Sequence, residues 1–133
     1  MAVNKILVAA LTLPILAHLA TDVAAAEGKP LTASEMQALL SNGLTIGIMD
    51  VNGGTKFRGS VTINADGTQS GSLLPTGQSP IALSGSWKLK GAKFCRVLRP
   101  VSDKEVCETW VKTGDKQITV MIGAKPAGLN ILP

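Results

Sequence analysis

Apolar and polar residues alternate along most of the chain after Gly43, a pattern typical of β-strands with one buried face. Ile46 and Ile48 alternate in this way ahead of a cluster of turn residues, and the stretch from Phe57 to Ile63 does so again. Short strands at regular intervals favour an antiparallel meander over units in which strands alternate with helices. The later strands are expected at 69–74, 81–90, 93–98, 105–111 and 116–122, with 129–132 as an eighth if it pairs.

One short helix is expected before the first of these strands. Thr32 and Glu35 fit a capping box, in which each side chain satisfies a free backbone N–H at the start of a helix. Apolar residues follow at helical spacing, and Gly43 is the type of residue that ends helices in a left-handed conformation. The pattern predicts a helix over 33–41 with its apolar side laid against the sheet.

Together these elements predict a mostly β fold, a small antiparallel meander barrel or tight sandwich of seven to eight strands with one short N-terminal helix. Closure into a barrel is the favoured arrangement because it leaves no sheet edge with unpaired backbone groups. Two local features are also expected: a bulge or tight bend at Gly59, and a two-residue hairpin turn at Asp66-Gly67.

The segment before the helix has the features of a secretory signal. Lys5 precedes an apolar stretch over 6–17, which is too short to span a bilayer, since spanning takes about 20 apolar residues. The small residues up to Ala26 offer an Ala-x-Ala cleavage site. We therefore expect 1–26 to be a signal peptide cleaved after about Ala26, with 27–133 a single periplasmic or secreted domain without a transmembrane segment. An uncleaved anchor is the alternative.

Cys95 and Cys107 are the only cysteines, and a pair in an exported chain most often forms a disulfide. A hairpin centred on Val101 would place the two directly opposite each other, at a spacing close to what the bond requires. The same register would pair Leu98 with Lys104 around a five-residue loop. The sequence predicts a disulfide-stabilised domain.

The residue inventory excludes several kinds of chemistry. The only histidine, His18, lies inside the expected signal, so the mature domain would lack the usual general base and the commonest metal ligand. Ser-x-x-Lys and the glycine-rich nucleotide motifs are absent as well. We expect that the protein is not an enzyme and that it binds no cofactor and no metal. A carboxylate-dependent hydrolase is a distant alternative, drawing on Asp50, Asp66, Asp103, Glu105, Glu108 and Asp115.

Positive charge concentrates in one stretch. The whole chain has 13 Lys and Arg against 9 Asp and Glu, a formal charge of +4, and the expected signal carries one residue of each sign. One interpretation is a solvated strand face guarded against edge pairing by lysines. The other is a binding face for an anionic envelope component or an acidic protein patch, and few aromatics are available to stack nucleic-acid bases. The candidate residues are Lys88, Lys90, Lys93, Arg96 and Arg99.

Trp87 and Trp110 flank the expected disulfide hairpin. They either cap the core beside the disulfide or present an aromatic contact residue to a partner.

The Gly85-Ser86-Trp87-Lys88-Leu89 segment, followed by the two cysteines and Trp110, resembles small exported bacterial proteins, mostly alphaproteobacterial, that carry a Gly-x-Trp strand and a Cys-Cys hairpin. The likeness spans roughly 31–122. It implies an exported β domain and no particular chemistry.

The same features are similar to those of periplasmic barrel inhibitors of secreted metalloproteases, which combine a Trp-x-Leu strand, one disulfide and a later Trp. In such inhibitors the N-terminal segment blocks the protease cleft, which here implies a role for 27–31. The spacing of the two cysteines is shorter than in that family.

Our first hypothesis is a non-catalytic periplasmic or secreted binding module for an envelope component or a protein partner, acting through a loop end or the basic face. A protease inhibitor is the second. The sequence leaves the ligand and the oligomeric state open.

Overall fold

A computed structural model describes residues 28–133 of the chain. The predicted signal peptide over 1–26 and its cleavage site lie outside the described residues.

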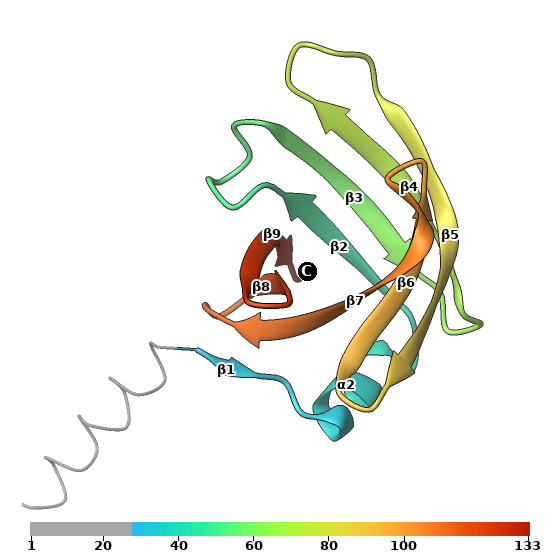
Figure 1. The fold of residues 1–133 in the computed structure, drawn as a ribbon, viewed down its shortest axis with the longest axis vertical. Coiled ribbons are helices and arrows are strands. Elements are labelled where there is room, and N and C mark those ends of the chain that lie inside the picture. Colours follow the sequence, from blue (N-terminus) through green and yellow to red (C-terminus); the bar gives the residue numbers. More distant parts are fainter. Residues whose placement is uncertain (1–27) are drawn as a thin grey trace, which may run out of the picture.

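The described residues form an eight-stranded antiparallel barrel, as the alternation predicts (Figure 1). Each strand from β2 to β9 pairs with the next along the chain, and β9 pairs back with β2 to close the circle. The barrel strands are β2 (Leu44–Met49), β3 (Phe57–Ile63), β4 (Thr68–Pro75), β5 (Ile81–Lys90), β6 (Lys93–Arg99), β7 (Ser102–Lys112), β8 (Gln117–Ile122) and β9 (Lys125–Ile131).

A ninth strand, β1 (Lys29–Pro30), lies outside the barrel and was not predicted. It pairs with Lys112 and Val111 at the end of β7, beyond the part of β7 that pairs with β6. Two residues are too few to show an alternating pattern, so only the tertiary structure reveals this strand.

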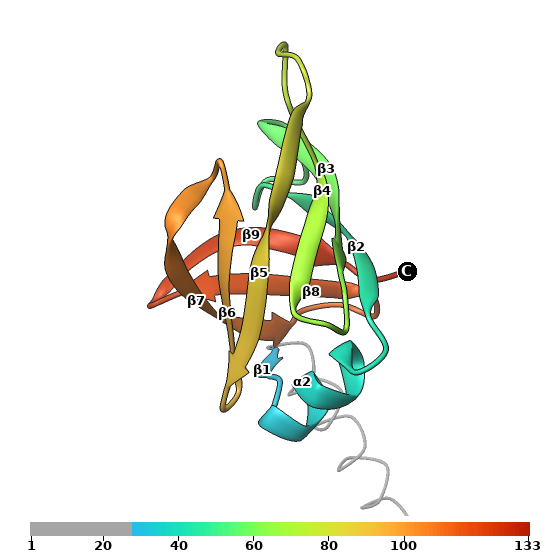
Figure 2. The same cartoon turned by 90° about the vertical axis from the view of Figure 1, so that its right-hand side faces the viewer.

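The helix α2 (Ala33–Leu40) covers one end of the barrel, which we call the closed end (Figure 2). Thr32 forms the predicted capping box with Glu35. Met36 and Leu40, at 0% and 1% exposed, enter the core from this side. The opposite end, which we call the open end, consists of the connections 50–56, 76–80, 100–101 and 123–124.

Glycines allow neighbouring strands to approach closely on the wall formed by β3, β4 and β5. A Cβ atom at Gly85 would lie 1.8 Å from the carbonyl oxygen of Val97, and one at Gly71 would lie 2.1 Å from that of Ser60. At Gly59 the predicted bulge is wrong, because the pairing with both neighbouring strands runs through this residue without a shift. Gly59 instead serves a close approach to the backbone of β4.

Two predicted turns differ in detail from the structure. The β3–β4 connection spans 64–67 rather than two residues, because the Asp66 carboxylate accepts hydrogen bonds from both the backbone N–H and the hydroxyl of Thr68. In the β6–β7 hairpin Leu98 pairs with Ser102, not with Lys104, since the register shifts between Arg96 and Leu98. The shift shortens the loop and extends β7 toward the open end.

The core lies inside the barrel and includes Trp110, and the partly buried Trp87 packs against it. Trp110 is 1% exposed, and its ring lies 4.9 Å from that of Phe94, which in turn stacks on Trp87 at 5.7 Å. The Trp87 indole N–H donates to the carbonyl of Asn64 at 2.8 Å. The aromatic side chains therefore pack together inside the barrel wall, with Trp87 partly buried.

Candidate ligand-binding cavity

A cavity of about 370 Å³ lies in the barrel interior, where core side chains such as Phe94 and Trp110 line it, and it reaches the open end. Small-molecule sites typically measure about 300–1,000 Å³ and are mostly apolar. Eight strands enclose an interior just wide enough to be filled by side chains or to hold one small ligand. The lining is mostly aliphatic and aromatic, and near the open end it includes Met49, Phe57, Leu73, Val101, Ile122 and Ala127.

Polar side chains line the same cavity. Gln69 is the second residue of β4, near the closed end, whereas Asn130 pairs with Ile118 of β8 and with Ile48, the last but one residue of β2. Arg96 and Glu108 occupy the middle of β6 and β7. All four side chains line the cavity together with core residues such as Phe94 and Trp110, so the interior combines polar and apolar groups behind an apolar mouth.

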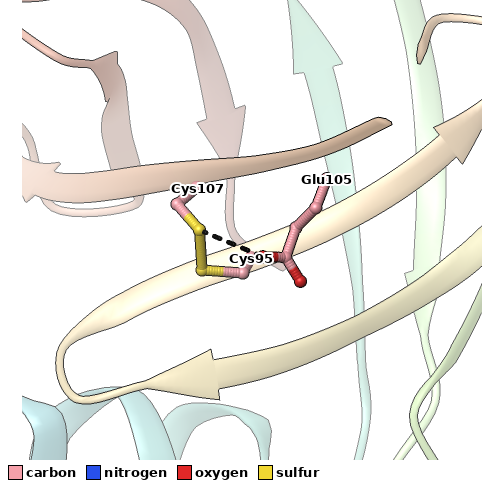
Figure 3. Close-up of side chains that lie close together, drawn as sticks. All are labelled: Cys95, Glu105 and Cys107. Atoms are coloured by element: carbon pink, nitrogen blue, oxygen red, sulfur yellow. Dashed lines mark hydrogen bonds between the residues drawn. A yellow bond between two sulfur atoms is a disulfide. The ribbon is translucent and has the colours of Figure 1, made fainter. Parts of the chain in front are cut away.

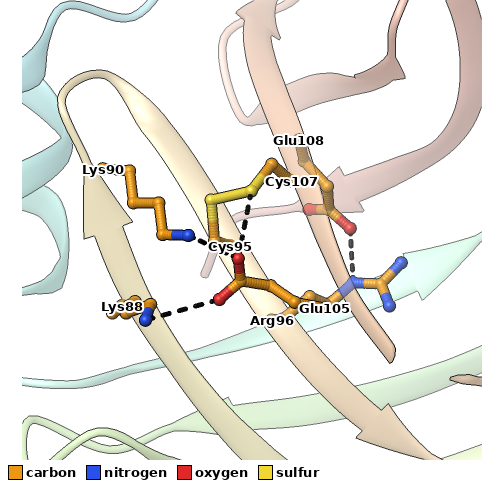
Figure 4. Close-up of a disulfide and its surroundings, with 7 residues drawn as sticks. All are labelled: Lys88, Lys90, Cys95, Arg96, Glu105, Cys107 and Glu108. Atoms are coloured by element: carbon orange, nitrogen blue, oxygen red, sulfur yellow. Dashed lines mark hydrogen bonds and ion pairs between the residues drawn. A yellow bond between two sulfur atoms is a disulfide. The ribbon is translucent and has the colours of Figure 1, made fainter. Parts of the chain in front are cut away.

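Arg96 and Glu108 form a buried ion pair, drawn in Figure 4. The Arg96 Nε–H donates to Oε2 of Glu108 at 2.5 Å, and the indole N–H of Trp110 donates to Oε1 at 2.9 Å. The two charged side chains are only 14% and 7% exposed. Within residues 28–133, the buried Nη1 atom of Arg96 has no hydrogen-bond partner.

The exposed large apolar side chains of the described residues gather at the open end. They are Val51, Leu74, Val101 and Ile122, which are 39–53% exposed. Val101 and Ile122 also line the cavity, whereas Leu74 faces a shallow groove on the outer wall. Apolar side chains at the rim of an apolar cavity suit the passage of an apolar ligand.

Asp50 organises the longest open-end connection, 50–56. Its carboxylate accepts hydrogen bonds from the backbone N–H groups of Asn52, Lys56 and Phe57 at 2.7–3.1 Å. Burial by itself would raise the pKa of Asp50, but these hydrogen bonds stabilise the charged form and lower the pKa to about 2. The loop beside the mouth is thus held by a carboxylate rather than by apolar packing.

The structure separates the predicted basic stretch into two faces. Lys88, Lys90, Lys93 and Arg99 are exposed on the outside of the barrel, whereas Arg96 points inward. Glu105 accepts from Lys90 at 2.5 Å and lies 3.5 Å from Lys88, and Asp103 pairs with Arg99 at 3.2 Å. The basic stretch has no acidic residue of its own, but Asp103 and Glu105 of the neighbouring strand β7 lie beside it. These carboxylates reduce the positive potential that the sequence suggests.

The disulfide between Cys95 and Cys107 is present, with the predicted pairing of β6 and β7 (Figure 3). It lies on the outer side of the wall, where Sγ of Cys107 approaches Oε1 of Glu105 at 3.9 Å. These three residues are the one group of potential metal ligands found in the part of the chain that the structure describes. Because the sulfurs are bonded to each other, they are not thiolate ligands.

The carboxylates weighed for hydrolysis do not meet in the cavity. Of the six, only Glu108 lines it, and Glu108 is engaged by Arg96 and Trp110. Asp50 and Asp66 bind backbone N–H groups in their own loops, and Glu105 and Asp103 face cations on the outside.

The alternation by itself did not single out Gln69 and Asn130 as site residues. Gln69 lies on the inward face of β4 together with Leu73. A polar residue at an inward position of the alternating pattern was the sequence signal that could have identified it. Asn130 lies on β9, which runs from Lys125 and not, as predicted, from Leu129.

In the part of the chain that the structure describes, no helix has the length and apolar character needed to cross a membrane. Comparison with protein-family models, curated proteins and solved structures found no match to this chain.

Proposed function

We propose that this chain is a non-catalytic periplasmic or secreted binding module, and that it takes up an envelope component as a small, largely apolar molecule through the open end of the barrel. The observation that carries the proposal is the cavity of about 370 Å³, apolar at the mouth and closed at the far end by α2. The disulfide suits an oxidising compartment. The rim formed by Val101 and Ile122 suits an apolar ligand.

Titration with N-phenyl-1-naphthylamine, a small neutral dye that fluoresces in apolar surroundings, tests the proposal. We expect saturable one-to-one binding and a change in tryptophan fluorescence, because Trp110 lines the cavity. Ala127→Trp at the mouth should block binding, since the larger side chain fills the opening. Ala82→Trp, an equal substitution at an exposed position on the outer side of β5, is the matched control and should bind the dye normally.

Absence of saturable binding by the wild-type protein, or equal binding by Ala127→Trp, would remove the cavity as the site. Lys88→Glu distinguishes the basic face from the cavity. It should leave dye binding unchanged, because Lys88 lies on the outer wall beside Glu105.

A protease inhibitor is the second candidate, favoured by the position of β1. Lys29 and Pro30 are exposed and extended, and among residues 28–133 β1 pairs with β7 on one side only. A free strand edge can add to the substrate groove of a protease. The test is titration of secreted metalloproteases with the domain, and unchanged protease activity at a molar excess would end this candidate.

A further inference from the structure

The polar side chains that line the cavity indicate the chemical class of its ligand, provided that the cavity binds one as proposed above. Four polar side chains lie within a mostly apolar cavity lining. Binding sites commonly orient a ligand with such a small number of polar groups. Arg96 and Glu108 lie in the middle of β6 and β7, inward of the apolar mouth, which favours a ligand that enters with its polar group first. Its apolar body would then lie against the aliphatic and aromatic mouth.

The Arg96 guanidinium supplies the hydrogen-bond donor that lacks a partner. Its Nε–H is held by Glu108, while Nη1 is buried without an acceptor among residues 28–133. A buried donor without a partner costs about 1–3 kcal/mol, so an oxygen acceptor on a ligand would recover free energy there. A purely hydrocarbon ligand would leave this donor unsatisfied.

The charge of the pair distinguishes between acceptors. Glu108 already faces the charge of Arg96, and its side chain is 7% exposed. A carboxylate or phosphate on the ligand would bring a second negative charge beside Glu108 in a poorly hydrated space. Burying a charge without a partner is costly, whereas burying a carbonyl that receives a hydrogen bond is not.

We infer that the barrel selects an amphiphile whose polar group is a neutral oxygen acceptor, such as an ester or amide carbonyl, bound by Arg96 in a cavity that Gln69 and Asn130 also line. The volume of about 370 Å³ is near the lower end of the range for small-molecule sites, about 300–1,000 Å³. This size fits an aromatic or short acyl ester and excludes a complete diacyl lipid.

Three probes of similar size test the inference by displacement of the bound dye: methyl 3-phenylpropanoate, the 3-phenylpropanoate anion and pentylbenzene. Transfer from water alone favours pentylbenzene over the ester. We expect the ester to bind, relative to pentylbenzene, about tenfold more tightly than this transfer predicts, the effect of one hydrogen bond to a charged donor. We call this excess the preference for the ester. The anion should bind more weakly than the ester at neutral pH.

The variant Arg96→Met/Glu108→Gln removes both charges and keeps an acceptor for the Trp110 indole N–H. It should lose the preference for the ester while retaining pentylbenzene. If this variant does not fold, Asn130→Leu, which removes another polar side chain of the cavity lining, should reduce the same preference. The affinities of the wild-type protein for the three probes test the inference whether or not the variants fold.

An ester-to-pentylbenzene affinity ratio no higher than transfer from water predicts, or tighter binding of the anion than of the ester, would overturn the assignment of the polar group and leave the proposed cavity function standing. Failure of the dye and of all three probes to bind would overturn both.

Discussion

The two ends of the barrel are built in different ways. At the closed end, α2 inserts Met36 and Leu40 into the core, and the Trp87 indole is anchored to the Asn64 carbonyl. At the open end, apolar side chains such as Val101 are exposed, and a carboxylate, Asp50, holds the longest loop. The closed end is therefore covered by buried helix residues, whereas the open end has the exposed apolar rim of the cavity.

The difference has a physical origin in how a barrel interior is filled. Side chains packed to native density leave no room for a ligand, and an unfilled interior forfeits packing energy. In this barrel α2 covers one end, and a cavity lined partly by core side chains reaches the other. Substitutions at the two ends should consequently separate stability from binding.

The largest effect is expected from Leu40→Ala at the closed end. Leu40 is 1% exposed, and truncation of such a residue costs about 2–5 kcal/mol through lost burial and the cavity left behind. Urea unfolding of the variant and the wild type measures the difference. A loss below about 1 kcal/mol would mean that the helix is not part of the main core.

A smaller loss is expected on removing the disulfide, which links two neighbouring strands midway between the ends. The bond closes a loop with a sequence separation of 12, for which chain entropy predicts about 3 kcal/mol. Cys95→Ser/Cys107→Ser should unfold at lower urea and still bind the dye. Chemical reduction of the wild-type protein is the control and should give the same shift.

Asp50→Asn should loosen the loop at the open end in a pH-dependent way. Because the pKa of Asp50 falls from 3.8 to about 2 in the folded protein, its stabilising contribution is complete above about 3.8 and is lost as the pH falls toward 2. The variant should be less stable than wild type at neutral pH. The gap should close in acid, and a gap that is constant across this range would show that the charge of Asp50 is not involved.

The smallest effect on stability is expected from Val101→Ser at the rim. Val101 is 53% exposed, so the free energy of unfolding should change by no more than about 0.5 kcal/mol. Dye affinity should fall about fourfold, the effect of losing roughly one methylene of apolar contact. Leu74→Ser, at an exposed position outside the cavity, is the matched control and should not alter affinity.

The strands, the helix with its capping box and the disulfide were predictable because each depends on local signals. Alternation with a period of two identifies a strand, and the hydroxyl and carboxylate at Thr32 and Glu35 identify a helix start. The pairing of Cys95 with Cys107 follows from the hairpin between them. The errors at Leu98 and Asp66 concern the last residues of hairpins, where side-chain hydrogen bonds and a register shift decide the loop length.

The sequence by itself determined a disulfide-linked β meander, because strand periodicity, turn residues and hairpin pairing act over a few residues at a time. Only the tertiary structure decided which end is packed and which is accessible, and that Arg96 lies inside while its neighbouring lysines lie outside. Closure of β9 onto β2 brings Asn130 and Gln69 into the same interior as the Arg96–Glu108 pair. The reason is that the contents of a barrel come from strands far apart in the chain, and no local pattern records which side chains meet there.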